Sequence, residues 1–351
     1  MKEILREIVT GPWTRGSRKC RNVIKKIIQN SYLVELGARL TSPSVVILRY
    51  HSVQDRPELF SNSIGDGIVH RKSAFKEQME IVARCFTPIT LDDILLFIKN
   101  GKGIPRKAVA VTFDDGFVDN YEIAAPILDS LGFRAAFYVT VGSVETRKPP
   151  WFYRLRRAFF TTRRRDWLDS KEGQVWKLDN QEGKNAAFMF ACEQCARLTS
   201  DTQELNLKRI EDVLGVDPPH KADNVMMNWE QIKQLHKAGH IIGSHTLTHP
   251  NLARIEETDL RGELNVSKQI IEDKLGTSII HFSYPSPILE PHWTEATIKA
   301  TREAGYQTAV TCTPGSVRIN TNPLSLNRIW VPQQKNEFLW NLDCTFLGRK
   351  M

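Results

Sequence analysis

The chain has 351 residues, enough for one barrel-sized domain or two smaller domains with a well-formed core. Its hydrophobic fraction of 41% and charged fraction of 25% are typical of a globular protein. No apolar stretch approaches the ~20 residues of a membrane span, and the N-terminus lacks the charged-then-apolar layout of a signal peptide. A cytoplasmic location is therefore the expectation.

The formal net charge of +8 is concentrated in two segments. The first thirty residues hold eight basic residues and only two acidic ones, and residues 147–165 hold eight basic residues and no acidic one. Such segments attract phosphate groups and anionic membrane surfaces, so peripheral contact with the inner face of the membrane is one expectation. Solvated surface charge is the alternative. No feature indicates a nucleic-acid partner.

Seven short apolar runs, starting after a basic and mostly helical arm at residues 1–43, predict strands. They are Val45–Tyr50, Ala108–Phe113, Ala135–Thr140, His240–Ser244, Ile279–Tyr284, Gln307–Cys312 and Leu326–Val331. Helical patterns separate most of them, at Ser73–Arg84, Asn120–Leu131, Trp229–Ala238, Glu257–Leu275 and Thr294–Ala304. This alternation predicts an α/β fold with a parallel sheet, and about seven units suggest a closed barrel spanning residues 44–351.

Residues 146–225 interrupt this alternation as a predicted helical insertion. Near its start, an aromatic face comprising Trp151, Phe152, Leu155, Ala158 and Phe159 is flanked by arginines. Packing onto the barrel is the favoured interpretation, and a membrane-interface element is the alternative. The pair Cys192 and Cys195 falls on a helical pattern and is interpreted as core rather than as zinc ligands.

The strand at Ala108–Phe113 ends in two adjacent carboxylates, Asp114 and Asp115. Neighbouring buried acids need a counter-charge, which a divalent metal would supply. His245 and His249, four residues apart after another strand, are plausible partners. One aspartate with two histidines is a ligand set that leaves a coordination position open for water or substrate.

The motifs Thr112-Phe113-Asp114-Asp115-Gly116 and Ser244-His245-Thr246-Leu247-Thr248-His249 resemble those of the polysaccharide deacetylases, carbohydrate esterase family four, and the resemblance extends over roughly residues 45–332. It implies a distorted (β/α)7 barrel and a carbohydrate deacetylase. Asp115, His245 and His249 map to the metal ligands and Asp114 to the general base. By ligand type, zinc, cobalt and nickel are about equally suited.

The general acid of many relatives is a histidine near the last strand, and this chain has none there. His51, which follows the first strand, resembles the acid of the circularly permuted poly-N-acetylglucosamine deacetylase branch. His281 and His292 are the fallback candidates.

Departures from the family occur at Ser283, Ser286 and Pro287, where many members have arginine, an aromatic residue and glycine. The Ser286 backbone N–H aligns with the family's oxyanion donor. Arg328 is the candidate to replace the missing arginine beside Asp114.

The expected substrate is an acetylated glycan, or a lipid- or nucleotide-linked sugar, that loses an N-acetyl, O-acetyl or N-formyl group. A non-catalytic carbohydrate-binding relative is one alternative, although all four core positions are present. A phosphatase of the haloacid dehalogenase type is a weaker one, because its second acid would stand where Gly116 stands.

Overall fold

The structure is a computed structural model that describes residues 43–57, 68–101, 103–169, 173–217 and 225–349. Apart from residue 43, the predicted basic arm lies outside the described residues. Among the described helices, none combines the length and the apolar character needed to cross a membrane.

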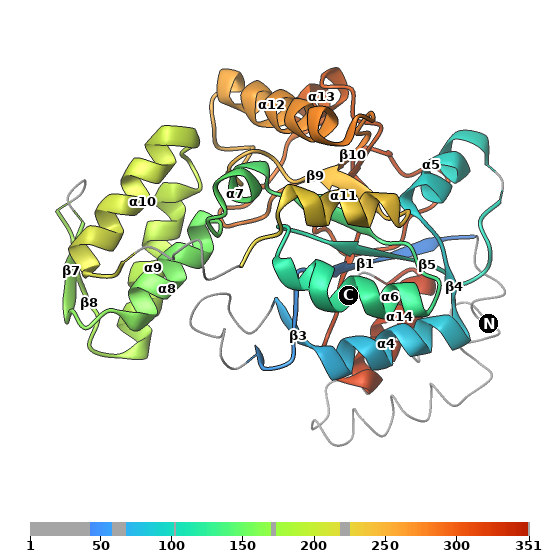
Figure 1. The fold of residues 1–351 in the computed structure, drawn as a ribbon, viewed down its shortest axis with the longest axis horizontal. Helices are drawn as coiled ribbons and strands as arrows, with labels where there is room; N and C mark the ends of the chain where they lie inside the picture. Colours follow the sequence, from blue (N-terminus) through green and yellow to red (C-terminus); the bar gives the residue numbers. More distant parts are fainter. Residues whose placement is uncertain (1–42, 58–67, 102, 170–172, 218–224, 350–351) are drawn as a thin grey trace.

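Seven parallel strands form the sheet that carries the site, in the order β11-β10-β9-β6-β5-β1-β12 (Figure 1). They are β1 (Val45–Tyr50), β5 (Ala108–Phe113), β6 (Ala136–Val139), β9 (Ile241–Ser244), β10 (His281–Ser283), β11 (Thr308–Val310) and β12 (Ile329–Trp330). The two-residue β4 (Thr87–Pro88) pairs with β5, and β2 (Ser52–Gln54) pairs with β3 (Val69–Arg71). All seven predicted strands are present, and the last five are shorter than predicted.

The two ends of this sheet meet through the segment that leads into β12. Leu326 forms a parallel bridge with Val310 of β11, and its amide donates to the Ala309 carbonyl at 2.8 Å. Three residues later, Ile329 pairs with Leu48 of β1. The sheet therefore curls into the distorted (β/α)7 barrel that the sequence predicted.

Alternation along the strands separates two apolar layers. In β1, Val46, Leu48 and Tyr50 pack in the large core between sheet and helices, whereas Val45 and Ile47 belong to a smaller cluster inside the barrel. Helices surround the sheet in Figure 1. They are α4 (Lys72–Cys85), α5 (Leu91–Asn100), the π-helical turn η3 (Asn120–Ala124) leading into α6 (Ala125–Ser130), α7 (Val141–Thr146), α11 (Trp229–Lys237), α12 (Glu257–Leu275), α13 (Glu295–Glu303) and α14 (Lys335–Phe346).

The insertion forms a separate helical layer at the left of Figure 1, with its own apolar core. It consists of α8 (Trp151–Thr161), α9 (Gln181–Cys195), α10 (Ser200–Leu214) and an antiparallel pair, β7 (Asp166–Leu168) and β8 (Val175–Lys177). The prediction of a purely helical insertion missed this pair, because three-residue strands are too short to show a period of two.

The aromatic face of α8 is packed rather than exposed. Leu155, Ala158 and Phe159 are buried in the core of the insertion, and Trp151 is 3% exposed. Cys192 and Cys195 are buried in the same core, as the sequence interpretation favoured. Burial removes this face as a membrane-contacting surface, so the membrane-interface alternative for it is wrong.

Candidate metal and catalytic site

The predicted site residues meet at one rim of the barrel, where the parallel strands end. Asp114 and Asp115 follow β5, His245 follows β9, and His51 follows β1. Residues at the carboxyl ends of neighbouring strands converge because the strands run in the same direction. The chain thus brings together side chains that lie nearly two hundred residues apart.

Asp115, His245 and His249 form the candidate metal site. Nε2 of each histidine lies 3.5 Å from Oδ1 of Asp115, and one ligand atom from each residue lies within 4.8 Å of the others. Two zinc bonds of ~2.1 Å at a tetrahedral angle separate their ligand atoms by ~3.4 Å. Both distances from Asp115 therefore fit a shared ion.

The local chemistry also fits a cation. Oδ1 of Asp115 is buried and has no hydrogen-bond partner among the described residues. Burial, and then the neighbouring charge of Asp114, raise the pKa of Asp115 well above its usual range. An unpaired buried carboxylate is costly, and a bound divalent ion would remove that cost.

Two of these candidate ligands have a left-handed backbone conformation. Asp115 has φ 74° and His249 has φ 61°, values that cost a non-glycine residue roughly 1–3 kcal/mol each. Gly116 follows with φ 86°, and a Cβ there would lie 3.2 Å from a methyl carbon of Val139. This glycine therefore allows the chain to turn sharply after the two carboxylates.

Hydrogen bonds fix the orientation of the histidine loop. Nδ1 of His245 lies 2.7 Å from the carbonyl oxygen of Ser283, so the ring donates from Nδ1 and Nε2 is left to bind a metal. The buried Glu263 of α12 accepts from the amides of Leu247 and Thr248 at 2.8 Å each, and from the Thr248 hydroxyl. Burial lowers the pKa of both His245 and His249, which keeps the rings neutral.

Asp114 is paired with Arg328 through two parallel hydrogen bonds. Nη1 lies 2.8 Å from Oδ1 and Nη2 lies 2.7 Å from Oδ2, and both side chains are almost fully buried. Ser283 donates to Oδ1 of Asp114 at 3.1 Å and accepts from Nη2 of Arg328. Burial opposes ionisation, but the adjacent guanidinium holds the pKa of Asp114 well below its usual range. Arg328 therefore lies beside Asp114, where the sequence analysis expected it to replace the arginine missing at position 283.

His51 lies beside this pair, with Nε2 4.0 Å from Oδ2 of Asp114. Burial lowers the pKa of His51 to about 3, against the opposing effect of Asp114. The fallback His281 is bound elsewhere, because Nδ1 contacts the Thr308 hydroxyl and Nε2 lies 3.0 Å from Asp92 of α5. The sequence-predicted acid therefore lies at the site and this alternative does not.

Ser286 lines a cavity of about 420 Å³ at the rim. Tyr284 and Trp293, stacked with centroids 5.9 Å apart, form its aromatic wall, and the fallback His292 also lines it. The Ser286 hydroxyl contacts Sγ of Cys312 at 2.8 Å, and its amide has no acceptor among the described residues. Pro287 leaves that amide in place.

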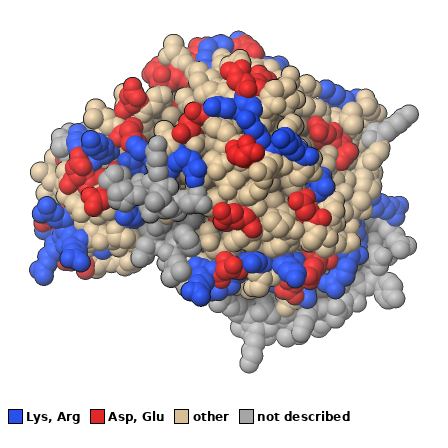
Figure 2. Space-filling view, viewed as in Figure 1, with Lys and Arg blue, Asp and Glu red and all other residues tan. Residues whose placement is uncertain are grey.

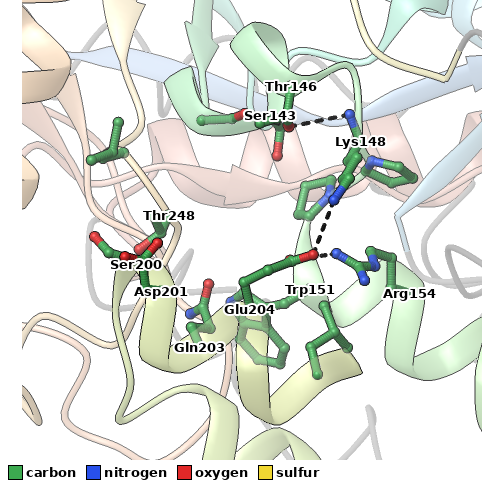
Figure 3. A pocket seen from close by; sticks show the side chains of 15 residues that line it. Ser143, Thr146, Lys148, Trp151, Arg154, Ser200, Asp201, Gln203, Glu204 and Thr248 are labelled. Carbon is green, nitrogen blue, oxygen red and sulfur yellow. Dashed lines mark hydrogen bonds and ion pairs between the residues drawn. The ribbon is translucent and has the colours of Figure 1, made fainter. Parts of the chain in front are cut away.

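A second cavity, of about 230 Å³, separates the barrel from the insertion (Figure 3). Its cations are already paired within the protein. Glu204 accepts from Lys148 at 3.1 Å and from Arg154 at 2.6 Å, and Arg154 also bonds to the buried Glu211. Trp151, which also lines this cavity, donates from its ring N–H to the His249 carbonyl at 3.0 Å. The insertion thereby supports a candidate metal ligand.

Comparison with known proteins agrees with this geometry. A sequence model of the family described as polysaccharide deacetylase matches residues 101–167 and 218–309, which include Asp114, Asp115, His245 and His249. The putative polysaccharide deacetylase YxkH of Bacillus subtilis (strain 168) is 21% identical over 286 residues, covering 81% of this chain and 70% of that protein.

Solved structures share the fold. The Streptococcus pyogenes deacetylase PplD in complex with acetate gives a TM-score of 0.59 at 19% identity, covering 87% of this chain and 99% of that chain. IcaB from Ammonifex degensii gives a TM-score of 0.53 at 16% identity, covering 86% and 98%. The matched residues, with the two motifs that hold the candidate site, make the chain similar to the polysaccharide deacetylase family, carbohydrate esterase family four.

Two polar residues near the site were not singled out from the sequence, Arg49 and Glu263. Arg49 follows Val45 and Ile47 at the two-residue spacing of β1, so strand alternation could have placed it on the inner face of the barrel. Glu263 gave no such signal, because its role depends on where α12 packs against the histidine loop.

Proposed function

We propose that the chain is a metal-dependent deacetylase that hydrolyses the acetamide of an N-acetylated sugar, with O-acetyl or N-formyl groups as alternative targets. One observation carries the proposal: Asp114, paired with Arg328, lies next to the candidate triad of Asp115, His245 and His249 at one rim. Hydrolysis needs an activated water, charge stabilisation at the carbonyl oxygen and a proton for the departing amine.

A metal held by Asp115, His245 and His249 would polarise the carbonyl and lower the pKa of a water. Asp114 is the group to accept the proton of that water, because Arg328 keeps its carboxylate ionised. The Ser286 amide, on the cavity wall, is the donor that would stabilise the carbonyl oxygen as it becomes negative.

His51 is the proposed acid. Its low pKa keeps it neutral at rest, so it must first gain a proton before giving one to the leaving amine. Oδ2 of Asp114, 4.0 Å from Nε2 of His51, is the nearest carboxylate oxygen that could pass on the proton taken from water. This order makes Asp114 and His51 successive carriers of one proton.

The metal is proposed to be zinc, with cobalt and nickel equally compatible with two imidazoles and one carboxylate. The decisive experiment measures tightly bound metal by elemental analysis, together with acetate release from an N-acetylglucosamine oligomer. The proposal predicts about one metal per chain and metal-dependent acetate release. A protein without metal and without acetate release would overturn it.

A non-catalytic carbohydrate-binding relative is the second candidate function. It would bind the oligomer, even with metal present, but would release no acetate. The phosphatase alternative has little support, because position 116 is glycine and two histidines share Asp115.

For the carrier and location, the proposal is a lipid- or nucleotide-linked glycan at the cytoplasmic face of the membrane. Several of the basic residues in segment 147–165 are already engaged within the protein. Arg154 is buried in ion pairs, Arg156 lies over the Phe160 and Phe188 rings, and Arg157 donates to the Asp217 carbonyl. Residues 163–165 are exposed arginines, and Figure 2 shows Lys and Arg gathered at the insertion end, at the left of the view.

Vesicle co-sedimentation tests this part. Replacing Arg163, Arg164 and Arg165 by Gln should weaken binding to anionic vesicles, in a manner that added salt mimics. Equal, negligible binding by both proteins would leave these arginines as solvated surface charge.

A further inference from the structure

Among the described residues, Arg328 and Arg49 lie on the inner face of the barrel near the site, and they differ in their partners. Arg328 forms hydrogen bonds with Asp114, Ser283 and the Thr311 carbonyl. Arg49 makes no ion pair or hydrogen bond with any described residue, and its buried Nε is without a partner. A partly buried cation that has no counter-charge among the described residues is costly, and a bound anion would remove that cost.

The position of Arg49 follows from strand alternation. It continues the inner face of β1 above Val45 and Ile47 and stands in register with Thr112 of β5, two residues before Asp114. It is also two residues before His51. Arg49 therefore lies in the uppermost layer of the barrel interior, directly below the rim that holds the site.

The strand register places Arg49 next to the residues that hold the proposed base. Thr112, its partner on β5, accepts a hydrogen bond at 3.2 Å from Nη1 of Arg328, which is the arginine paired with Asp114. On the cavity wall, burial and then the charge of Arg49 lower the pKa of His292, against the opposing effect of Glu290.

The charges of the described residues at the site, together with a bound divalent ion, sum to an excess of positive charge. Arg328 cancels Asp114, and a divalent ion would exceed the single charge of Asp115. Arg49 adds a further positive charge. Glu290, which also lines the cavity, has a side chain that is 86% exposed and lies 3.5 Å from His292, so solvent screens its charge. A ligand that brings its own anion would balance this site.

We propose that Arg49 binds an anionic group, a carboxylate or a phosphate, on the sugar that carries the acetamide or on the unit bonded to it. This deepens and rests on the proposed deacetylase function, since it names the substrate class as anionic N-acetylated sugars. A guanidinium offers paired N–H donors that match either anion. The chemistry is shared by sugar acids and by sugar phosphates, and the two are separated by experiment.

The test measures acetate release from three matched substrates: a neutral N-acetylglucosamine oligomer, an oligomer with an N-acetylmuramic acid unit, and N-acetylglucosamine 1-phosphate. The wild type should prefer at least one anionic substrate in kcat/KM. Replacing Arg49 by Gln should reduce the ratio of anionic to neutral kcat/KM by roughly 10- to 100-fold, mainly through KM. Arg49→Lys should recover part of that ratio.

The exposed Arg84→Gln on α4 is the matched control and should keep the wild-type ratio. Metal content and melting temperature are compared in every variant, so that a folding defect is recognised. Acetate release with the same efficiency from all three substrates, and an equal effect of Arg49→Gln on each, would overturn the inference while leaving the deacetylase intact.

Failure of every substrate would instead count against the proposed function. In that case calorimetry with inorganic phosphate and with N-acetylmuramic acid still tests Arg49 itself. Binding that weakens in Arg49→Gln and not in Arg84→Gln supports the anion site, and undetectable binding to the wild type contradicts it.

Discussion

Arg328 and Asp114 are 214 residues apart in the chain and form a buried, doubly hydrogen-bonded ion pair at the rim of the barrel. The arginine comes from the segment just before β12, and the carboxylate follows β5 on the other side of β1. The small Ser283 side chain contacts both partners. The proposed base thus takes its supporting charge from a strand different from the one that the family's usual pattern indicates.

We expect Arg328→Lys to retain metal and to lower turnover by roughly 10- to 100-fold, because lysine keeps a charge but loses the paired geometry. The pKa of Asp114 should rise, so activity should be lost at a higher pH as the medium is acidified. The pH profile of kcat measures this. A wild-type profile in Arg328→Lys would contradict the role of the pair.

A swap of positions tests the same relationship from the other side. Arg328→Ser alone leaves a buried, unpaired carboxylate and should destabilise the fold by about 3–5 kcal/mol. Adding Ser283→Arg to this variant restores an arginine next to Asp114 and should recover part of the stability and turnover. Chemical denaturation and acetate release are the two measurements.

We expect His51→Ala to bind metal as the wild type does and to lose roughly 10²–10⁴ in turnover, because the leaving amine then lacks its proton donor. A substrate with an activated leaving group, such as an acetyl ester of a nitrophenol, needs no such donor and should be hydrolysed nearly normally. Unchanged turnover on the sugar would redirect the acid role to His292, on the cavity wall.

Glu263 is expected to position the metal ligands without touching the metal. Glu263→Ala removes the acceptor of two loop amides and should weaken metal binding by about 10- to 100-fold. Glu263→Gln keeps one acceptor oxygen and should recover most of the affinity. Competition with a chelator measures both, and Glu257→Ala at the exposed start of the same helix is the control. Equal metal affinity in Glu263→Ala and wild type would exclude this role.

The buried His70 predicts a loss of stability on acidification. Burial lowers its pKa to about 4, against a hydrogen bond with the Val331 carbonyl. In the unfolded chain His70 has its ordinary pKa of ~6.5. Between that pH and about 4, the unfolded chain therefore binds more protons at this residue than the folded chain does. Stability from this group is complete above pH ~6.5 and falls by at most roughly 3 kcal/mol as the pH drops to 4.

His70→Phe keeps the ring against Tyr50, whose centroid is 4.9 Å away, and removes the titrating nitrogen. The dependence of the unfolding free energy on pH should be shallower in this variant between pH 6.5 and 4. Parallel curves for variant and wild type would show that other groups control acid unfolding.

Strands and motif residues were predictable because their signals are local. The apolar run of β5 ends abruptly in two carboxylates, and His245 and His249 follow β9 at the spacing of a familiar motif. Parallel strands then required these ends to meet. Even the Arg328 pairing could be suggested, since an arginine was missing at position 283.

Long-range packing decided what the sequence did not reveal. The aromatic face of α8 reads equally well as a membrane contact, and only the helices around it show that Phe159 is core. The same holds for Glu263, whose contacts lie 15 and 16 residues away on another element. For Arg49, the alternation along β1 could be recognised in the sequence, but the sequence does not show that its Nε has no partner among the described residues.

The most direct test of the account compares Asp115→Ala with Asp114→Asn for metal content and turnover in the same preparation. The account predicts that Asp115→Ala loses both, because two histidines alone hold the ion poorly, whereas Asp114→Asn keeps its metal and loses roughly 10²–10⁴ in turnover. Metal retained in Asp115→Ala and lost in Asp114→Asn would reverse the assignment of the two carboxylates and contradict the account.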